Sequence, residues 1–229
     1  MGGKKPADVP AYFIAEAAHY LCVPRTTVRD WVFGREYMVG GVQRKTKPLI
    51  TPADGPRELL SFLNLIELHV ISSIRRYHGV RLLQIRRSID YLSRAFKSKH
   101  PLLDKEMLTD GKSIFIEKYG QLINTSEDGQ IQMKIMMEAY LQRIVWDESG
   151  IPIRLFPFTR DNIKESPRLV AIDPKVRFGK PCISGTGIPT GIIAERHKAG
   201  DAMSLLASDY GRTFEEIEEA VRYESRAAS

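Results

Sequence analysis

Residues 171–190 read AIDPKVRFGKPCISGTGIPT, and this stretch decides the C-terminal fold. Three glycines and three prolines lie among regularly spaced apolar residues. Glycine supplies a positive φ and proline fixes φ at about −65°, so this composition is typical of short strands joined by tight turns. We predict a β-hairpin in which a strand at 175–178 pairs with a returning strand at 182–184.

Three short amphipathic segments follow this hairpin, at residues 191–198, at 202–208 and from Thr213 onward. Thr213 and Glu216 have the spacing of a capping box, which marks the start of the third helix. The sequence therefore predicts a C-terminal unit, residues 168–229, made of a β-hairpin and three helices in a homeodomain-like arrangement.

The C-terminal pattern resembles the family known as domain of unknown function 433. The resemblance covers roughly residues 169–224, and it rests on Ile172-Asp173-Pro174, Gly179-Lys180-Pro181, Gly185-Thr186, Ile188-Pro189, Ala199-Gly200, Asp209-Tyr210 and 220–223. Gly187 departs from the family, which usually has arginine there. A phosphate-binding loop is the alternative for these glycines, but Pro181 directly after Gly179-Lys180 removes an N–H that such a loop needs.

Length and composition restrict the class of protein. A chain of 229 residues with 43% hydrophobic residues can hold two or three small domains with folded cores. No run of about 18 apolar residues exists, so we expect no membrane span. Two distant cysteines and five scattered histidines predict free thiols and no metal site. We expect a cytoplasmic protein without a cofactor.

The positive charge lies in the first half of the chain. Residues 1–100 contain 17 Lys and Arg against 8 Asp and Glu, a net charge of +9, whereas residues 101–229 contain 17 against 20, a net charge of −3. Such an asymmetry is expected when one domain binds a polyanion.

A helix-turn-helix pattern gives this charge a specific meaning. Residues 12–21 and 25–32 predict two short helices, with Cys22 in place of the usual turn glycine. Val28, Trp31 and Val32 form an apolar face on the second helix. The candidate DNA contacts on this recognition helix are Arg25, Thr26, Thr27, Arg29 and Asp30.

A wing follows this pattern at residues 34–50, with Arg35, Arg44, Lys45 and Lys47 as candidate phosphate contacts. Two helices are predicted next, at 57–77 and 80–97. In the second helix, apolar residues from Leu82 to Phe96 form a continuous stripe, which we interpret as core rather than a dimer zipper. The whole N-terminal part, residues 1–100, resembles the winged helix-turn-helix domain of the MerR family.

Residues 101–167 predict a small α+β linker unit. Strands are expected at 113–116 and 121–124, a helix at 132–144, and a pairing of residues 143–147 with 153–156. The fold class is thus mainly α with small β elements. Carboxylate clusters lie only in predicted loops, and no nucleophile has a recognisable base, so we expect no catalytic residues.

Taken together, the chain resembles a VapB-type antitoxin with a MerR-like N-terminus. This resemblance implies a PIN-like ribonuclease toxin as partner, a double-stranded DNA operator for autorepression, and a homodimer. The candidate toxin contacts are Glu215, Glu218 and Glu219, with Ile183 on a strand edge that we expect at the dimer surface. The alternative is a stand-alone MerR-like transcriptional regulator whose C-terminal domain serves dimerisation or sensing.

Overall fold

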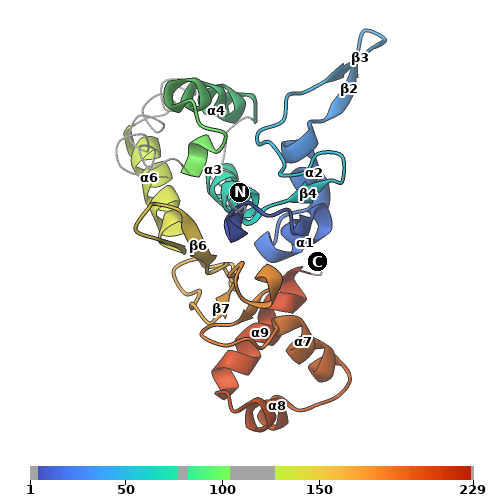
Figure 1. The fold of residues 1–229 in the computed structure, drawn as a ribbon, viewed down its shortest axis with the longest axis vertical. Helices are drawn as coiled ribbons and strands as arrows, with labels where there is room; N and C mark the ends of the chain where they lie inside the picture. The colour runs from blue at the N-terminus through green and yellow to red at the C-terminus, as the bar shows by residue number, and fades with distance from the viewer. Residues whose placement is uncertain (1–4, 77–81, 104–126, 228–229) are drawn as a thin grey trace.

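The computed structural model describes residues 5–76, 82–103 and 127–227 (Figure 1). Its N-terminal elements are η1 (Pro6–Asp8), β1 (Tyr12–Phe13), α1 (Ile14–Leu21), α2 (Arg25–Phe33), β2 (Glu36–Val39), β3 (Val42–Lys45), β4 (Leu59–Leu60), α3 (Phe62–Arg76), α4 (Leu82–Phe96) and η2 (Pro101–Leu103). The remaining elements are α6 (Glu127–Leu141), β5 (Ile144–Trp146), β6 (Pro152–Leu155), β7 (Val170–Ala171), η4 (Arg177–Gly179), β8 (Cys182–Ile183), α7 (Thr190–Lys198), α8 (Met203–Tyr210) and α9 (Phe214–Ala227). The predicted mixed α+β class is confirmed.

Helices α1 and α2 form the predicted helix-turn-helix. The turn between them is made by Cys22, whose φ of 50° is left-handed and ends α1 where a glycine is more common. The apolar face of α2 is buried, as predicted, with Val28 and Trp31 at most 2% exposed. This burial fixes the outer face of α2 toward solvent.

Two segments that we expected to be helical are extended instead. Tyr12–Phe13 is strand β1, and it pairs antiparallel with strand β4, Leu59–Leu60. Helix α3 therefore begins at Phe62 rather than at Arg57. A positive φ of 54° at Glu58 turns the chain just before β4, and the Ser61 hydroxyl then accepts a hydrogen bond from the Asn64 N–H in the first turn of α3.

The middle of the chain is organised by a buried arginine. Arg143 donates hydrogen bonds to the carbonyl oxygens of Phe156, Pro157, Ser166 and Pro167. The strands next to it, β5 and β6, pair antiparallel with Ile144 opposite Leu155, within one residue of the two ranges predicted to pair. Helix α6 ends at Leu141, three residues earlier than predicted, and the strands expected at 113–116 and 121–124 lie outside the described residues.

The predicted C-terminal hairpin is wrong in its first strand. Strand β8 pairs with β7, Val170–Ala171, whereas Arg177–Gly179 is the 3-10 turn η4. The reason lies at Asp173, whose side chain accepts the Lys175 N–H and whose carbonyl accepts the Val176 N–H, so that the chain turns instead of extending. The three helices follow as predicted, and the capping box is present, with Thr213 N–H bonded to Glu216 Oε2 at 2.8 Å.

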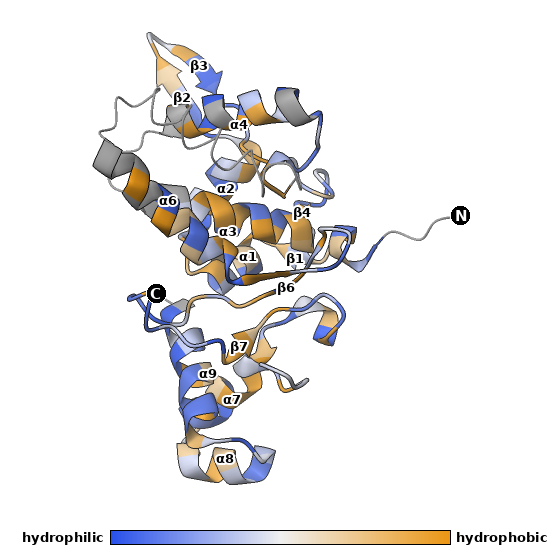
Figure 2. Cartoon of the chain, turned by 90° about the vertical axis from the view of Figure 1, so that its left-hand side faces the viewer, coloured by the Kyte–Doolittle hydropathy of each residue, from blue (hydrophilic) through white to orange (hydrophobic). Residues whose placement is uncertain are grey.

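Two hydrophobic cores are present in the described part of the chain. The larger contains α1 to α4, α6, β6 and Ile172, and mostly hydrophobic α3 lies at its centre (Figure 2). The smaller is formed by Ile183, Ile193, Leu206, Ile217 and Ala220. The domain boundary at residue 100 remains a prediction, although the larger core contains residues from both sides of it. The apolar stripe of α4 is part of this core, as predicted, because its residues Ile85, Ile89 and Leu92 are buried.

Candidate nucleic-acid interface

The outer face of α2 is polar and accessible. Arg25, Thr26 and Arg29 are exposed, whereas Thr27 and Asp30 are half-buried. The buried Trp31 on the opposite face holds the helix against the core, so the position of these side chains is set by packing. An exposed helix of this kind, placed second in a helix-turn-helix, is the element that reads the major groove in known DNA-binding proteins.

Arg29 is already paired in the structure. Its guanidinium donates to both oxygens of Glu58, with N–O distances of 2.8 and 3.0 Å. These hydrogen bonds hold the pKa of the Glu58 carboxyl below its usual value, so the carboxylate is charged at neutral pH. Glu58 was not among the candidates, because it lies 29 residues from Arg29 in a loop whose path the sequence does not indicate.

The wing is a two-stranded antiparallel ribbon of β2 and β3, paired from Glu36–Lys45 to Val39–Val42. Its candidate phosphate contacts Arg35, Arg44, Lys45 and Lys47 are all exposed. At its base, Arg86 of α4 donates to the Lys47 carbonyl at 2.7 Å and to Thr46 Oγ1 at 3.0 Å. Arg86 thus fixes the angle of the wing, a role that no local pattern indicated.

Two of the candidate partner contacts in the C-terminal unit are corrected by the structure. Ile183 is fully buried in the smaller core, because β8 packs beneath the helices rather than at a free edge. Glu219 is also fully buried, and it accepts hydrogen bonds from Thr159 and from Arg160 at 2.9 Å. Burial opposes its ionisation, but these hydrogen bonds outweigh burial and lower the pKa of Glu219.

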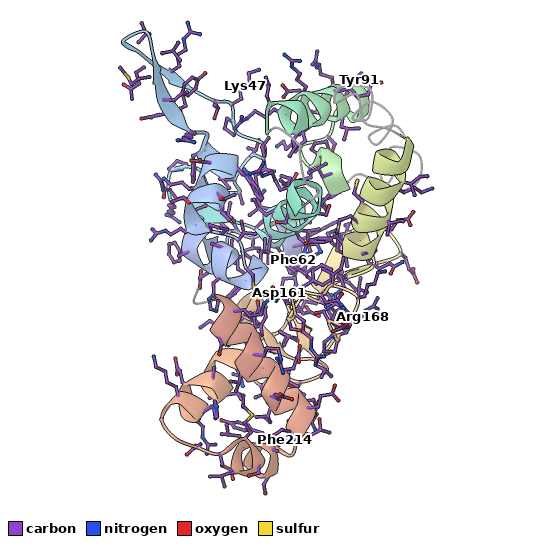
Figure 3. All side chains as sticks on the ribbon, turned by 180° about the vertical axis from the view of Figure 1, so that it is seen from behind. Lys47, Phe62, Tyr91, Asp161, Arg168 and Phe214 are labelled. Carbon is purple, nitrogen blue, oxygen red and sulfur yellow. The ribbon has the colours of Figure 1, made fainter. Side chains whose placement is uncertain are left out.

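The other two glutamates remain accessible. Glu215 is exposed, and Glu218 is half-exposed and bonded to Arg222 one turn later at 2.9 Å. Phe214 at the start of α9 and Leu205 of α8 are 54% and 48% exposed. Phe214 and Lys47 of the wing lie toward opposite ends of the molecule (Figure 3).

Residues 5–76, 82–103 and 127–227 contain neither a metal-binding cluster nor a membrane-spanning helix. Within these ranges no group of three or more His, Cys, Asp or Glu side chains is placed to hold a metal ion. Within the same ranges no helix is long and apolar enough to cross a membrane.

Comparisons with known proteins match both ends of the chain. A family model described as "Putative DNA-binding HTH domain" matches residues 10–89, and one described as "Protein of unknown function (DUF433)" matches residues 170–223. The protein named "Putative antitoxin VapB45" from Mycobacterium tuberculosis is 30% identical over 233 residues, with 93% of each chain covered. The chain belongs to the VapB45 antitoxin family.

Two further matches, one to a sequence and one to a solved structure, also come from M. tuberculosis. Uncharacterized protein Rv2308 is 23% identical over 228 residues, covering 94% of this chain and 90% of its own. The crystal structure of Rv2018 superposes with a TM-score of 0.69 at 25% identity, covering 93% of this chain and 98% of that one. The predicted resemblance to VapB antitoxins and the N-terminal helix-turn-helix are thereby confirmed, and the chain is an antitoxin or a DNA-binding regulator.

Proposed function

We propose that this chain is a non-enzymatic antitoxin of the cytoplasm that neutralises a PIN-like ribonuclease toxin and, as a homodimer, represses its own operon. The observation that carries the DNA-binding half is the exposed face of α2 beside a wing with four accessible cations. The name of the VapB45 relative supports the antitoxin half. The opposite positions of the wing and α9 leave room for DNA and toxin on one chain (Figure 3).

Binding to the chain's own promoter tests the DNA half. We expect Arg25→Ala to weaken specific binding by roughly 1–3 kcal/mol, because a side chain that reaches a base edge discriminates between sequences. Arg44→Ala should weaken binding to all duplexes alike and reduce its salt dependence, because phosphate contacts carry no sequence information. Lys198→Ala is the matched control, since Lys198 is an exposed cation at the end of α7, a helix that lies away from α2 and the wing (Figure 1).

Fluorescence anisotropy with the promoter duplex and a scrambled duplex gives these affinities. Equal affinity of the wild-type protein for both duplexes would contradict autorepression. Sedimentation velocity on the wild-type protein tests the homodimer, and a monomer at the concentrations that bind DNA would contradict it.

The toxin half is tested at α9. Glu215 and Glu218 present negative charge beside the exposed ring of Phe214, which fits a toxin with a basic RNA-binding groove. Replacing both glutamates with Lys should slow association with the toxin expressed from the neighbouring gene, most strongly at low salt. The same double replacement at Glu148 and Glu165, which are exposed in the middle of the chain, is the control. Unchanged growth rescue by the Glu215 and Glu218 variant would move the toxin contact to another surface.

A sensing regulator is the second candidate, and a cleft between the N- and C-terminal units favours it. The cleft has a volume of about 460 Å³, and His19, Tyr20, Ile192, Glu195 and Glu224 are among the residues that line it. A ligand held there would touch both α1 of the helix-turn-helix and α7. Co-expression separates the two functions, because only an antitoxin copurifies with the neighbouring gene's product and restores growth in its presence.

A further inference from the structure

The wing has an unusual surface for an element that contacts phosphates. All eight residues of β2 and β3 are exposed, and four of them are large and apolar. Tyr37, Met38, Val39 and Val42 are 41%, 64%, 49% and 59% exposed. The ribbon pairs only with itself and projects away from the rest of the molecule (Figure 1). Exposed apolar groups gathered in this way mark a contact surface.

The register sorts these side chains onto two faces. Residues directly opposite each other in an antiparallel pair share a face, so Tyr37, Val39, Val42 and Arg44 lie on one side of the ribbon. On the other side, Gln43 donates to Glu36 at 3.0 Å. The face with Tyr37 therefore ends at the tip with two valines and carries the Arg44 guanidinium two pairs behind them, whereas Met38 lies on the other face beside Gln43.

The tip itself is narrow. Gly40 and Gly41 have φ values of 57° and 78°, the pattern of a type I′ turn, and neither has a side chain. Open space surrounds both positions. Paired strands lie about 4.8 Å apart before the size of their atoms is added, and the minor groove of B-DNA is about 6 Å wide. The tip therefore fits only a widened minor groove, and a turn without side chains needs the least widening to bring the flanking valines to the base edges.

The charge of the wing indicates that its exposed surface binds DNA rather than a second copy of the chain. Residues 34–47 contain four Lys and Arg and one Glu, a net charge of +3. Two copies docked through their wings would bring together two segments that each carry a net charge of +3, and like charges at such a contact are destabilising. A duplex neutralises the same cations. The hydrogen bonds of Arg86 to Lys47 and Thr46 hold the base of the ribbon in place. The tip is therefore anchored when it contacts the DNA.

We propose that the tip of the wing, Val39 to Val42, is an apolar wedge that enters the minor groove and bends the operator. This inference rests on the proposed DNA-binding function. The wedge spreads a base step while Arg35, Arg44 and Lys45 hold the adjacent phosphates. Apolar side chains that are inserted between base steps kink the duplex toward the major groove, and the bent duplex then contacts a larger area of the protein.

The test is the double variant V39T/V42T in the full-length protein, with V9T as control. Threonine keeps the shape and the strand preference of valine but is polar, and Val9 is 41% exposed outside the wing. Anisotropy gives the affinity for the promoter duplex, and energy transfer between dyes at its two ends reports bending. We expect V39T/V42T to bind about tenfold more weakly and to lose the change in energy transfer, with the salt dependence unchanged. V9T should behave as wild type.

Each other outcome has a distinct meaning. Wild-type bending by V39T/V42T would overturn the wedge and leave the proposed function intact. Loss of self-association by V39T/V42T in sedimentation velocity would show that the surface joins two copies, and would also overturn it. Failure of the wild-type protein to bind any duplex would overturn both the proposed function and the wedge. R44A should lower the salt dependence and keep the bend.

Discussion

At the residue scale, Arg29 shows how one side chain serves both the free protein and the proposed complex. In the free protein its guanidinium is bonded to Glu58, so contact with DNA requires that this pair opens. The positive charge of Arg25 also attracts the Glu58 carboxylate and helps to lower its pKa. The carboxylate therefore competes with phosphates for the cations of α2.

Removing this charge should strengthen DNA binding. We expect Glu58→Gln to raise the affinity for a scrambled duplex several-fold at low salt, because Arg29 is released and a repelling charge is lost. Anisotropy titrations at two salt concentrations measure the effect. Glu148→Gln makes the same charge change on an exposed turn far from α2, and it should have no effect. A weaker promoter affinity for Glu58→Gln would mean that Glu58 holds Arg29 in its DNA-reading position.

Two glycines of the C-terminal unit share a left-handed backbone conformation but differ in the space around them. Gly179 and Gly185 both have a left-handed φ, of 77° and 74°. A Cβ on Gly179 would overlap the hydroxyl of buried Tyr12, whereas nothing lies within 4 Å of one on Gly185. At Gly179 the turn η4 therefore approaches Tyr12 of β1 so closely that no side chain fits between them.

Alanine at these two positions separates backbone strain from packing. Gly185→Ala should lower the free energy of unfolding by about 1–2 kcal/mol from the left-handed φ alone. Gly179→Ala should cost about 1–3 kcal/mol more, because Tyr12 must move. Urea denaturation of both variants measures the difference, and equal losses would show that the approach to Tyr12 is adaptable.

At the element scale, the sequence predicted those elements whose signals are local. The apolar face of α2 and the capping box of α9 were correct because each depends on residues within one or two turns. The strand at 175–178 was wrong because Asp173 closes a turn with its side chain. Glu219 was placed outward because its partners Thr159 and Arg160 lie about 60 residues away. Contacts between distant segments leave no local pattern.

Helix α3 and the residue just before the turn η2 are joined by a titratable pair. His100 Nδ1 lies 3.0 Å from the carboxylate of Glu67, which is 1% exposed. Burial raises the pKa of Glu67. Burial opposes protonation of His100, but the hydrogen bond and charge of Glu67 outweigh it and raise the pKa of His100, with Asp8 adding to the rise and Lys99 opposing it.

Both shifts have the same sign, so the protein should lose stability as pH rises. A group whose pKa is higher in the folded than in the unfolded protein contributes its full stabilisation at pH values below its unfolded pKa. This contribution is lost as pH rises through its folded pKa. For His100 the loss should therefore begin above about pH 6.5. Thermal unfolding of the wild type and of His100→Gln between pH 6 and 9 measures it. The variant should show a flatter profile, and parallel profiles would contradict this role for the pair.

At the scale of the whole molecule, the two cores are joined through the first helix of the helix-turn-helix. The hydroxyl of Tyr223 in α9 donates to the carbonyl of Tyr20 in α1 at 2.9 Å, and Tyr223 is fully buried. Next to it, Glu224 lies 2.6 Å from His19 Nε2. The C-terminal unit thus rests on the element that positions α2, a contact that neither family pattern predicted.

This junction should make α1 and α9 open together. Tyr223→Phe keeps the ring and removes one buried hydrogen bond, so we expect a loss of about 1–2 kcal/mol in the free energy of unfolding. Hydrogen exchange followed by mass spectrometry should then show faster exchange in both α1 and α9, because local opening follows packed units rather than sequence. Tyr91→Phe on the surface of α4, where the ring is 42% exposed, should leave both helices unchanged. Faster exchange in α9 alone would mean that the C-terminal unit opens independently of α1. Toxin bound to α9 would then not affect α2 through this junction.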